Sequence, residues 1–200
     1  MNTVGNAATL ACLWEVLAPK PGNVHRGADF EDLTFADFAT SAAVIGPILN
    51  RAATAGVGTT VRTGVAATRA AVATNTNLGM LLLLAPLAAV EESLSLREGI
   101  AAVLEGLTPA DTSEVYAAIR EAQPGGLGKV NEADVNEPPP EISLVEAMRL
   151  AAERDLIAQQ YANGFQQVFE LADRIAAARK AQLSFSDSIV RGYLELLAEY

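Results

Sequence analysis

The sequence predicts an all-α protein: a single-domain bundle of roughly eight to ten helices with one long ordered loop. Apolar residues recur every three to four positions along most of the chain, and no segment shows the alternation of a β-strand. Half of the 200 residues are hydrophobic and 19% are charged, which is typical of a folded chain and not of a disordered one. Because only 6% are aromatic, alanine and leucine must fill the core.

Five helices are expected in the first half of the chain. They are residues 10–17, residues 35–49 behind an N-cap at Thr34, residues 60–74, a helix from about residue 77, and residues 95–104 behind a capping box of Ser95 and Glu98. The apolar run 78–90 is shorter than the roughly 20 residues that span a bilayer. It therefore predicts a buried core helix, and we expect no contact with a membrane.

The second half begins with a helix from Pro109, capped by Thr108. An irregular stretch, 123–143, follows, and its three consecutive prolines exclude a helix. Ser143 and Glu146 form another capping box, and we expect one long helix from there to about Lys180. A last helix, 186–200, ends without a capping signal, so we expect one domain over residues 1–200, truncated at its C-terminus.

Charge and cysteine content narrow the function classes. The formal net charge of −10 argues against a general nucleic-acid binder, which would carry a basic face. The single cysteine, Cys12, excludes an internal disulfide and lies in an apolar stretch as buried filler. No signal-peptide pattern precedes the first helix, and a cytoplasmic protein is expected.

A first polar cluster is the opening loop, in which "PKPGNVHRG", residues 19–27, is followed by Asp29, Glu31 and Asp32. Its prolines stiffen Lys20, Gly22 lets a backbone approach closely, and lysine and arginine form charge-assisted bonds to phosphate. The alternative is an exposed loop with chance charges. The candidate ligand-binding residues here are Lys20, Gly22, Asn23, His25 and Arg26.

The second cluster, "TNTNLG", covers residues 74–79, between two apolar helices. Its candidate ligand-binding residues are Asn75, Thr76 and Asn77, because they offer more donors and acceptors than one helix cap needs. Plain capping is the alternative.

The third and fourth clusters lie farther along the chain. "GGLGKVNEADV" offers Gly125, Gly126, Gly128 and Lys129 as a phosphate-binding turn without Walker spacing. Its carboxylates, Glu132 and Asp134, could hold a magnesium ion through water. "AERDLIAQQYANGF" contributes Arg154, Asp155 and Gln159, with Asp155 and Gln159 expected on one helix face. An ordinary solvated helix face is the alternative for this last cluster.

These stretches resemble the triphosphoribosyl-dephospho-CoA synthase family (ATP:dephospho-CoA triphosphoribosyl transferases), in a divergent branch. The likeness rests on "PKPGNVHR", "TNTNLG" and the segment from Gly125 to Phe165, in family order. It implies an all-α transferase that binds ATP, dephospho-CoA or a related acceptor, and Mg²⁺. A ribose hydroxyl of dephospho-CoA would attack C1′ of the ATP ribose and release adenine. Asp29, Asp134 and Asp155 are then the catalytic candidates, and Asp134 and Asp155 the metal ligands.

The chain departs from this family at one motif. Members that make the prosthetic-group precursor of citrate lyase or malonate decarboxylase typically read "NTHKG", whereas Asn77 and Leu78 replace the His and Lys here. Three alternatives follow: a family member with a different substrate in one-carbon or pterin metabolism, a non-catalytic nucleotide- or phosphate-binding protein, and an alanine-rich interaction bundle.

Overall fold

The computed structural model of the protein describes residues 3–125 and 134–199. Within these ranges all regular secondary structure is α-helical, which confirms the predicted fold class. The helices are α1 (Val4–Leu17), α2 (Phe35–Leu49), α3 (Ala52–Ala55), α4 (Val57–Val72), α5 (Leu78–Ala88), α6 (Leu96–Glu105), α7 (Pro109–Ala122), α8 (Leu144–Ala151), α9 (Leu156–Asn163), α10 (Gln166–Lys180) and α11 (Phe185–Glu199).

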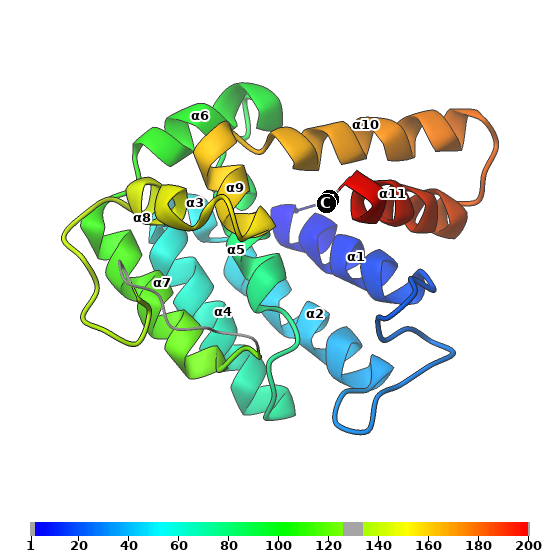
Figure 1. The fold of residues 1–200 in the computed structure, drawn as a ribbon, viewed down its shortest axis with the longest axis horizontal. Helices are drawn as coiled ribbons and strands as arrows, with labels where there is room; N and C mark the ends of the chain where they lie inside the picture. Colours follow the sequence, from blue (N-terminus) through cyan, green and yellow to red (C-terminus); the bar gives the residue numbers. More distant parts are fainter. Residues whose placement is uncertain (1–2, 126–133, 200) are drawn as a thin grey trace.

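Four helices, α1, α2, α4 and α7, lie side by side in that order (Figure 1). Helix α5 contacts all four of them, and also α6 and α9. Its buried residues, Leu78, Leu81, Leu82, Ala85, Pro86 and Ala88, belong to the middle of the core. The prediction that the apolar run forms a buried core helix is therefore confirmed. In the described part of the chain, no helix has the length and apolar character needed to cross a membrane.

The first two helices pack unusually closely because two glycines meet at their crossing. A Cβ added to Gly5 would lie only 2.0 Å from the carbonyl oxygen of Gly46. The backbone N–H of Gly5 also donates to Asn50 Oδ1 across the same contact, at 2.6 Å. Nearby on α1, Cys12 is buried as expected, and burial together with the charge of Glu15 raises the pKa of its thiol to about 12.

The predicted helix starts are confirmed at four positions. Capping boxes form at Thr34, Ser95, Thr108 and Ser143, each with an acidic residue three positions later. In each box the carboxylate accepts from the backbone N–H of the capping residue, which satisfies one of the donors that a helix start leaves free. These signals act within one turn, so the sequence alone could show them.

The single long helix expected from Ser143 to Lys180 is wrong: the segment forms α8, α9 and α10. The first break precedes Asp155, whose Oδ1 accepts from the backbone N–H groups of Ile157 and Ala158 and so starts α9. The second break is at Gly164 and Phe165, which both adopt left-handed backbone conformations, with φ of 75° and 65°. The short helix α3 was also not expected, and α4 begins one turn earlier than predicted, at Val57.

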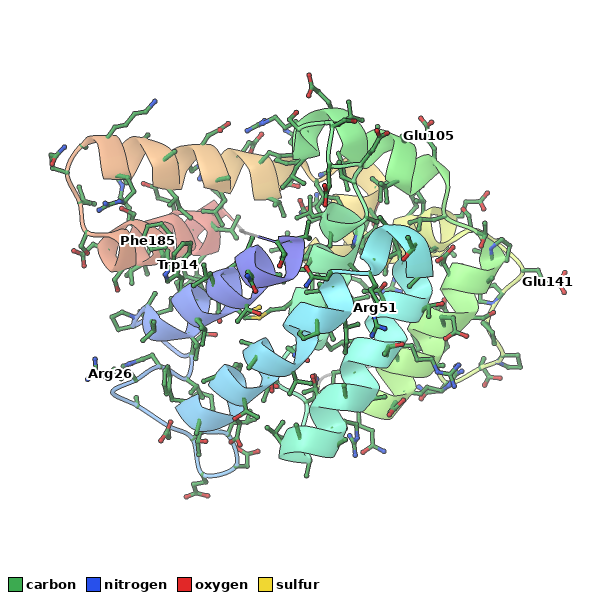
Figure 2. All side chains as sticks on the ribbon, turned by 180° about the vertical axis from the view of Figure 1, so that it is seen from behind. Trp14, Arg26, Arg51, Glu105, Glu141 and Phe185 are labelled. Atoms are coloured by element: carbon green, nitrogen blue, oxygen red, sulfur yellow. The ribbon has the colours of Figure 1, made fainter. Side chains whose placement is uncertain are left out.

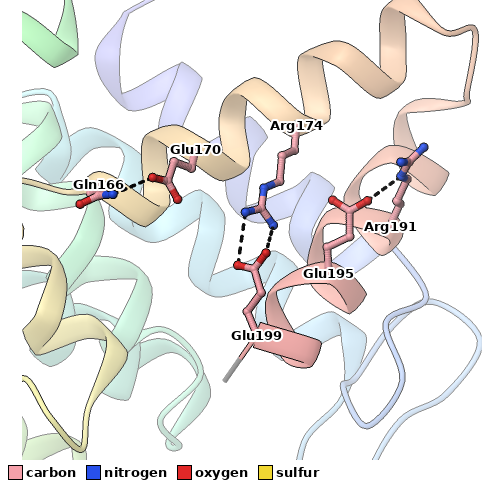
Figure 3. A network of polar contacts seen from close by, with 6 residues as sticks. All are labelled: Gln166, Glu170, Arg174, Arg191, Glu195 and Glu199. Carbon is pink, nitrogen blue, oxygen red and sulfur yellow. Dashed lines mark hydrogen bonds and ion pairs between the residues drawn. The ribbon is translucent and has the colours of Figure 1, made fainter.

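The last two helices form a hairpin that extends from the bundle beside α1 (Figure 1). Trp14 of α1 meets Phe185 of α11 with ring centroids 4.5 Å apart (Figure 2). Across the hairpin, Arg174 bonds both carboxylate oxygens of Glu199, while Arg191 and Glu195 pair along α11 (Figure 3). Both pairs lie within the hairpin, whereas the contact of Trp14 with Phe185 and the ion pair of Arg97 with Asp173 join the hairpin to the bundle.

Candidate functional site

Many polar groups of the opening loop, residues 18–34, form hydrogen bonds or ion pairs within the protein itself. Lys20 is only 5% exposed, and its Nζ donates to the backbone carbonyl of Glu15 and lies 2.9 Å from the Glu15 carboxylate. The carbonyl oxygen of Pro21 accepts from Tyr193 Oη of α11 at 3.0 Å. Lys20 therefore binds the last turn of α1 in this conformation.

Most other candidate residues of the opening loop also bind atoms of the protein itself. Gly22 has a φ of 77°, and Asn23 Nδ2 donates to the Pro21 carbonyl at 3.4 Å. His25 Nδ1 accepts from the backbone N–H of Gly27, at 3.1 Å. Asp29 Oδ1 accepts from the N–H of Phe35 at the start of α2, at 2.6 Å. Arg26 differs: it is exposed and points away from the bundle (Figure 2).

The turn between α4 and α5, residues 73–77, is a buried polar corner. Thr76 and Ser41 of α2 share a hydrogen bond of 2.5 Å, and Thr68 Oγ1 donates to Asn77 Oδ1 at 3.1 Å. Asn77 is 4% exposed, and its Nδ2 is buried without a hydrogen-bond partner. An unpaired buried donor is costly, and such groups are often found where a ligand or water completes the pairing.

Asn75 connects this corner to a surface pocket. Its Oδ1 accepts from the backbone N–H of Leu78 at 3.1 Å, which caps α5. The same residue lines a polar pocket of about 330 Å³, which we call the motif pocket. Its lining residues are Asp32, Leu33, Arg69, Ala73, Thr74, Asn75, Ala122, Gln123, Pro124 and Gly125.

The motif pocket is lined by residues from three of the four clusters singled out in the sequence, and of the described candidate residues Asn75 and Gly125 line it. Asp32 and Leu33 come from the opening loop, Thr74 and Asn75 from the second cluster, and Gly125 from the start of the glycine-rich segment. These segments are far apart in sequence. Their meeting at one pocket is the strongest structural indication of a site.

Strained backbone marks the same pocket. Ala73 and Gln123, the C-cap residues of α4 and α7, have φ of 59° and 48°. Residues with side chains adopt this left-handed region at a cost of about 1–2 kcal/mol. Strain of this kind persists where the surrounding structure enforces it, often at ligand sites.

The fourth cluster is arranged differently from the expectation. Asp155 is the N-cap of α9 and not a residue of its face, and Arg154 precedes the helix and donates to the carbonyl of Leu150 at 3.0 Å. Gln159 lies within α9, and its Oε1 is buried and unpaired. Tyr161 donates to the carbonyl of Leu82 at 2.6 Å, and complete burial raises its pKa strongly.

The glycine-rich segment is only partly described. Gly126, Gly128, Lys129 and Glu132 lie outside the described residues. Beyond them, Asp134 Oδ1 accepts from the backbone N–H of Asn136 at 2.8 Å. Arg120 of α7 donates to the carbonyl of Val135 at 2.7 Å. These contacts attach the described end of the loop to α7.

Tyr116 of α7 shows that two of the candidates share a neighbourhood. Burial raises the pKa of its hydroxyl, the charge of Asp134 raises it further, and the charge of Arg154 lowers it. Asp134 and Arg154 thus both act on Tyr116. Neither they nor Asp155 line the motif pocket.

The magnesium prediction stays a prediction. In the residues that the structure describes, no three His, Cys, Asp or Glu side chains gather as a metal site. Asp155 commits Oδ1 to the start of α9, and Asp134 commits Oδ1 to Asn136.

A second cleft, of about 400 Å³, lies between α6, α8 and α9, and we call it the α8 cleft. Its charged lining residues are Glu105, Glu146 and Arg149. Glu146 is held by the capping box at Ser143, whose hydrogen bonds are the main reason that its pKa is lowered. Arg149 lowers it further.

Two charged residues of the motif pocket, Asp32 and Arg69, were not among the candidates chosen from the sequence. Asp32 belongs to the opening cluster but follows its motif, and Arg69 resembles an ordinary basic residue in the last turn of α4. The sequence feature that could have identified Arg69 is its short separation along α4 from the second cluster. Arg69 lies just over one turn before "TNTNLG", near enough to share a site with it.

The chain matches a known family over its whole given length. The family model CitG, described as ATP:dephospho-CoA triphosphoribosyl transferase, matches residues 1–200. Neither the curated proteins nor the solved structures gave a match.

Proposed function

This chain belongs to the CitG family of ATP:dephospho-CoA triphosphoribosyl transferases, and on that premise we propose that the motif pocket carries out the family reaction. Family membership implies ATP and dephospho-CoA as substrates, with transfer of the triphosphoribosyl part of ATP to dephospho-CoA. The observation that carries the location is the meeting of three separate clusters at the motif pocket.

The proposed reaction exchanges one glycosidic bond for another. A ribose hydroxyl oxygen of dephospho-CoA bonds to C1′ of the ATP ribose, and the bond from C1′ to N9 of adenine breaks. The hydroxyl proton is lost and adenine leaves with a proton on its ring, so that charge and atoms balance. The triphosphate stays attached to the transferred ribose.

Such a displacement requires the protein to orient two nucleotides and to stabilise the departing adenine. Asp32 is the carboxylate among the described lining residues of the motif pocket. We assign it the role of general base, which accepts the proton of the attacking hydroxyl. The amide of Asn75 supplies a donor beside it, because only its oxygen is committed to α5. Asp29, Asp134 and Asp155 remain proposals for the catalytic carboxylate, although each already binds a backbone N–H.

Magnesium enters the proposal as a partner of the nucleotide. Mg²⁺ usually binds substrate phosphates with only one or two protein carboxylates and would neutralise phosphate charge. A cluster of three protein ligands is therefore not required. The cytoplasmic location expected from the sequence likewise stays a prediction.

A second candidate function follows from the α4–α5 turn. Asn77 is buried and bonded to Thr68, and Leu78 lies in the core, so neither can supply a proton or a charge. This favours a family member that binds a nucleotide or phosphorylated compound with a different acceptor, or without catalysis.

Adenine release separates these functions. We expect the purified full-length protein, incubated with ATP, Mg²⁺ and dephospho-CoA, to release one adenine for each acceptor modified, as measured by chromatography and mass spectrometry. Omitting dephospho-CoA is the control. Binding of ATP in calorimetry without adenine release would contradict transfer to dephospho-CoA and support the second candidate, which uses a different acceptor or binds without catalysis. The absence of any nucleotide binding would support the interaction bundle.

A further inference from the structure

We propose that Arg69 is the residue of the motif pocket that binds the phosphate chain of the nucleotide. The identity of the ligand as a nucleotide rests on the proposed function. The choice of Arg69 rests on the charges of the residues that line the pocket. A triphosphate carries several negative charges, and its binding site needs cationic donors. The described lining of the motif pocket contains one cationic side chain, Arg69.

The other cations suggested by the sequence are less suitable. Lys20 is buried and paired with Glu15, Arg26 is exposed on the opening loop, and Arg154 donates to the carbonyl of Leu150. Lys129 lies outside the described residues. None of the three described cations lines the motif pocket.

Arg69 itself is half-buried and uncommitted. Within the described ranges its guanidinium makes no ion pair and no side-chain hydrogen bond, even though Asp32 lines the same pocket. By contrast, Arg62 on the same helix bonds both carboxylate oxygens of Glu114, at 3.1 Å each. A half-buried guanidinium retains five donors for a ligand, in a planar arrangement that suits phosphate oxygens.

The neighbours of Arg69 complete an anion site. Asn75 and Gln123 line the same pocket, and the side-chain amide of each carries N–H donors. Thr68, the residue before Arg69, donates to Asn77, so the hydrogen bond between them fixes α4 to the α4–α5 turn. Arg69 and Asn75 are thereby held on one rigid unit, which lowers the entropy lost on binding.

The test is calorimetric titration of the full-length protein with sodium tripolyphosphate, which carries the charge of the nucleotide without its base or sugar. We expect Arg69→Gln to weaken binding by at least about tenfold, as the loss of charged hydrogen bonds predicts. Arg62→Gln on the same helix and Arg149→Gln in the α8 cleft are the matched controls, and each should change the affinity less than about twofold.

Arg69→Lys provides a second reading if the glutamine variant does not fold. It keeps the charge but loses the paired guanidinium bonds, so an affinity between those of the wild type and Arg69→Gln is expected. Wild-type affinity in either Arg69 variant, or no binding of tripolyphosphate by the wild type, would overturn the proposal. Adenine release tests the family reaction separately, since a protein can release adenine with its phosphates bound elsewhere.

Discussion

The motif pocket and the α8 cleft are similar in size, at about 330 and 400 Å³, yet they differ in how their charges are used. In the α8 cleft, Glu146 is held by Ser143, and Arg149 acts on Glu146. In the motif pocket, Arg69 has no such partner among the described residues, two residues have strained backbones, and the adjoining turn contains an unpaired amide. The side chain of Arg149 likewise makes no hydrogen bond or ion pair with a described residue, so backbone strain and the buried unpaired amide, and not volume, distinguish the motif pocket from the α8 cleft.

The largest expected effect tests whether the turn beside the motif pocket can carry a charge. Leu78→Lys should lower the free energy of unfolding by more than about 2 kcal/mol, because Leu78 is buried among apolar residues and a lone buried charge is costly. Denaturant titration would measure it, and Leu78→Met, which keeps the volume, should cost less than about 1.5 kcal/mol. Equal stability of the two variants would mean that this corner is open to solvent.

A smaller effect is expected from removing the partner of Asn77. Thr68→Val keeps the shape but leaves Asn77 Oδ1 without its hydrogen bond, beside an Nδ2 that already lacks one. We expect a loss of about 1–3 kcal/mol in unfolding free energy. Thr63→Val, at an exposed position of the same helix, should stay within about 0.5 kcal/mol of the wild type. A loss no larger than that of the control would show that the buried network contributes nothing.

The strain at the motif pocket predicts a gain in stability. Ala73→Gly should raise the unfolding free energy by about 0.5–1 kcal/mol, because glycine adopts a φ of 59° without steric cost. Ala66→Gly, inside α4 and exposed, should lower it by about the same amount. Thermal unfolding of both variants gives the answer, and destabilisation by both would refute the assigned strain.

The smallest effect concerns the α8 cleft. Hydrogen bonds from Ser143 lower the pKa of Glu146 first, and Arg149 adds to this. Ser143→Ala should therefore raise that pKa more than Arg149→Gln does, in a titration followed by NMR. The sign follows from what each variant removes, since both Ser143 and Arg149 favour the ionised carboxylate. The opposite order would mean that Arg149, like Arg69, is a dominant charge of its pocket.

The sequence predicts those features of the fold that depend on residues within one helical turn of each other, and it misses those that depend on backbone geometry. The capping boxes at Ser95 and Ser143 lie within one turn and were predictable. The break before α9 was missed because Asp155 was interpreted as a helix-face residue, and its capping role depends on backbone geometry. The second break is at Gly164, whose φ of 75° only a glycine adopts without strain, but a glycine in the sequence does not by itself show which φ it adopts.

The candidate site was predictable in its parts but not in its centre. Asn75 and Gly125 were chosen from local motifs, and both line the motif pocket. Arg69 became visible only once α4, α7 and the opening loop met, which is a property of tertiary packing. Lys20 looked available in the sequence, but its pairing with Glu15 one turn earlier depends on how the chain leaves α1.

The most direct test of the location is hydrogen–deuterium exchange of the full-length protein with and without saturating ATP and Mg²⁺. The account predicts slower exchange in the turn 73–77 and in residues 122–125, with unchanged exchange at residues 143–149 and 161–164 of the α8 cleft. Slower exchange confined to the α8 cleft, with the motif pocket unchanged, would contradict it.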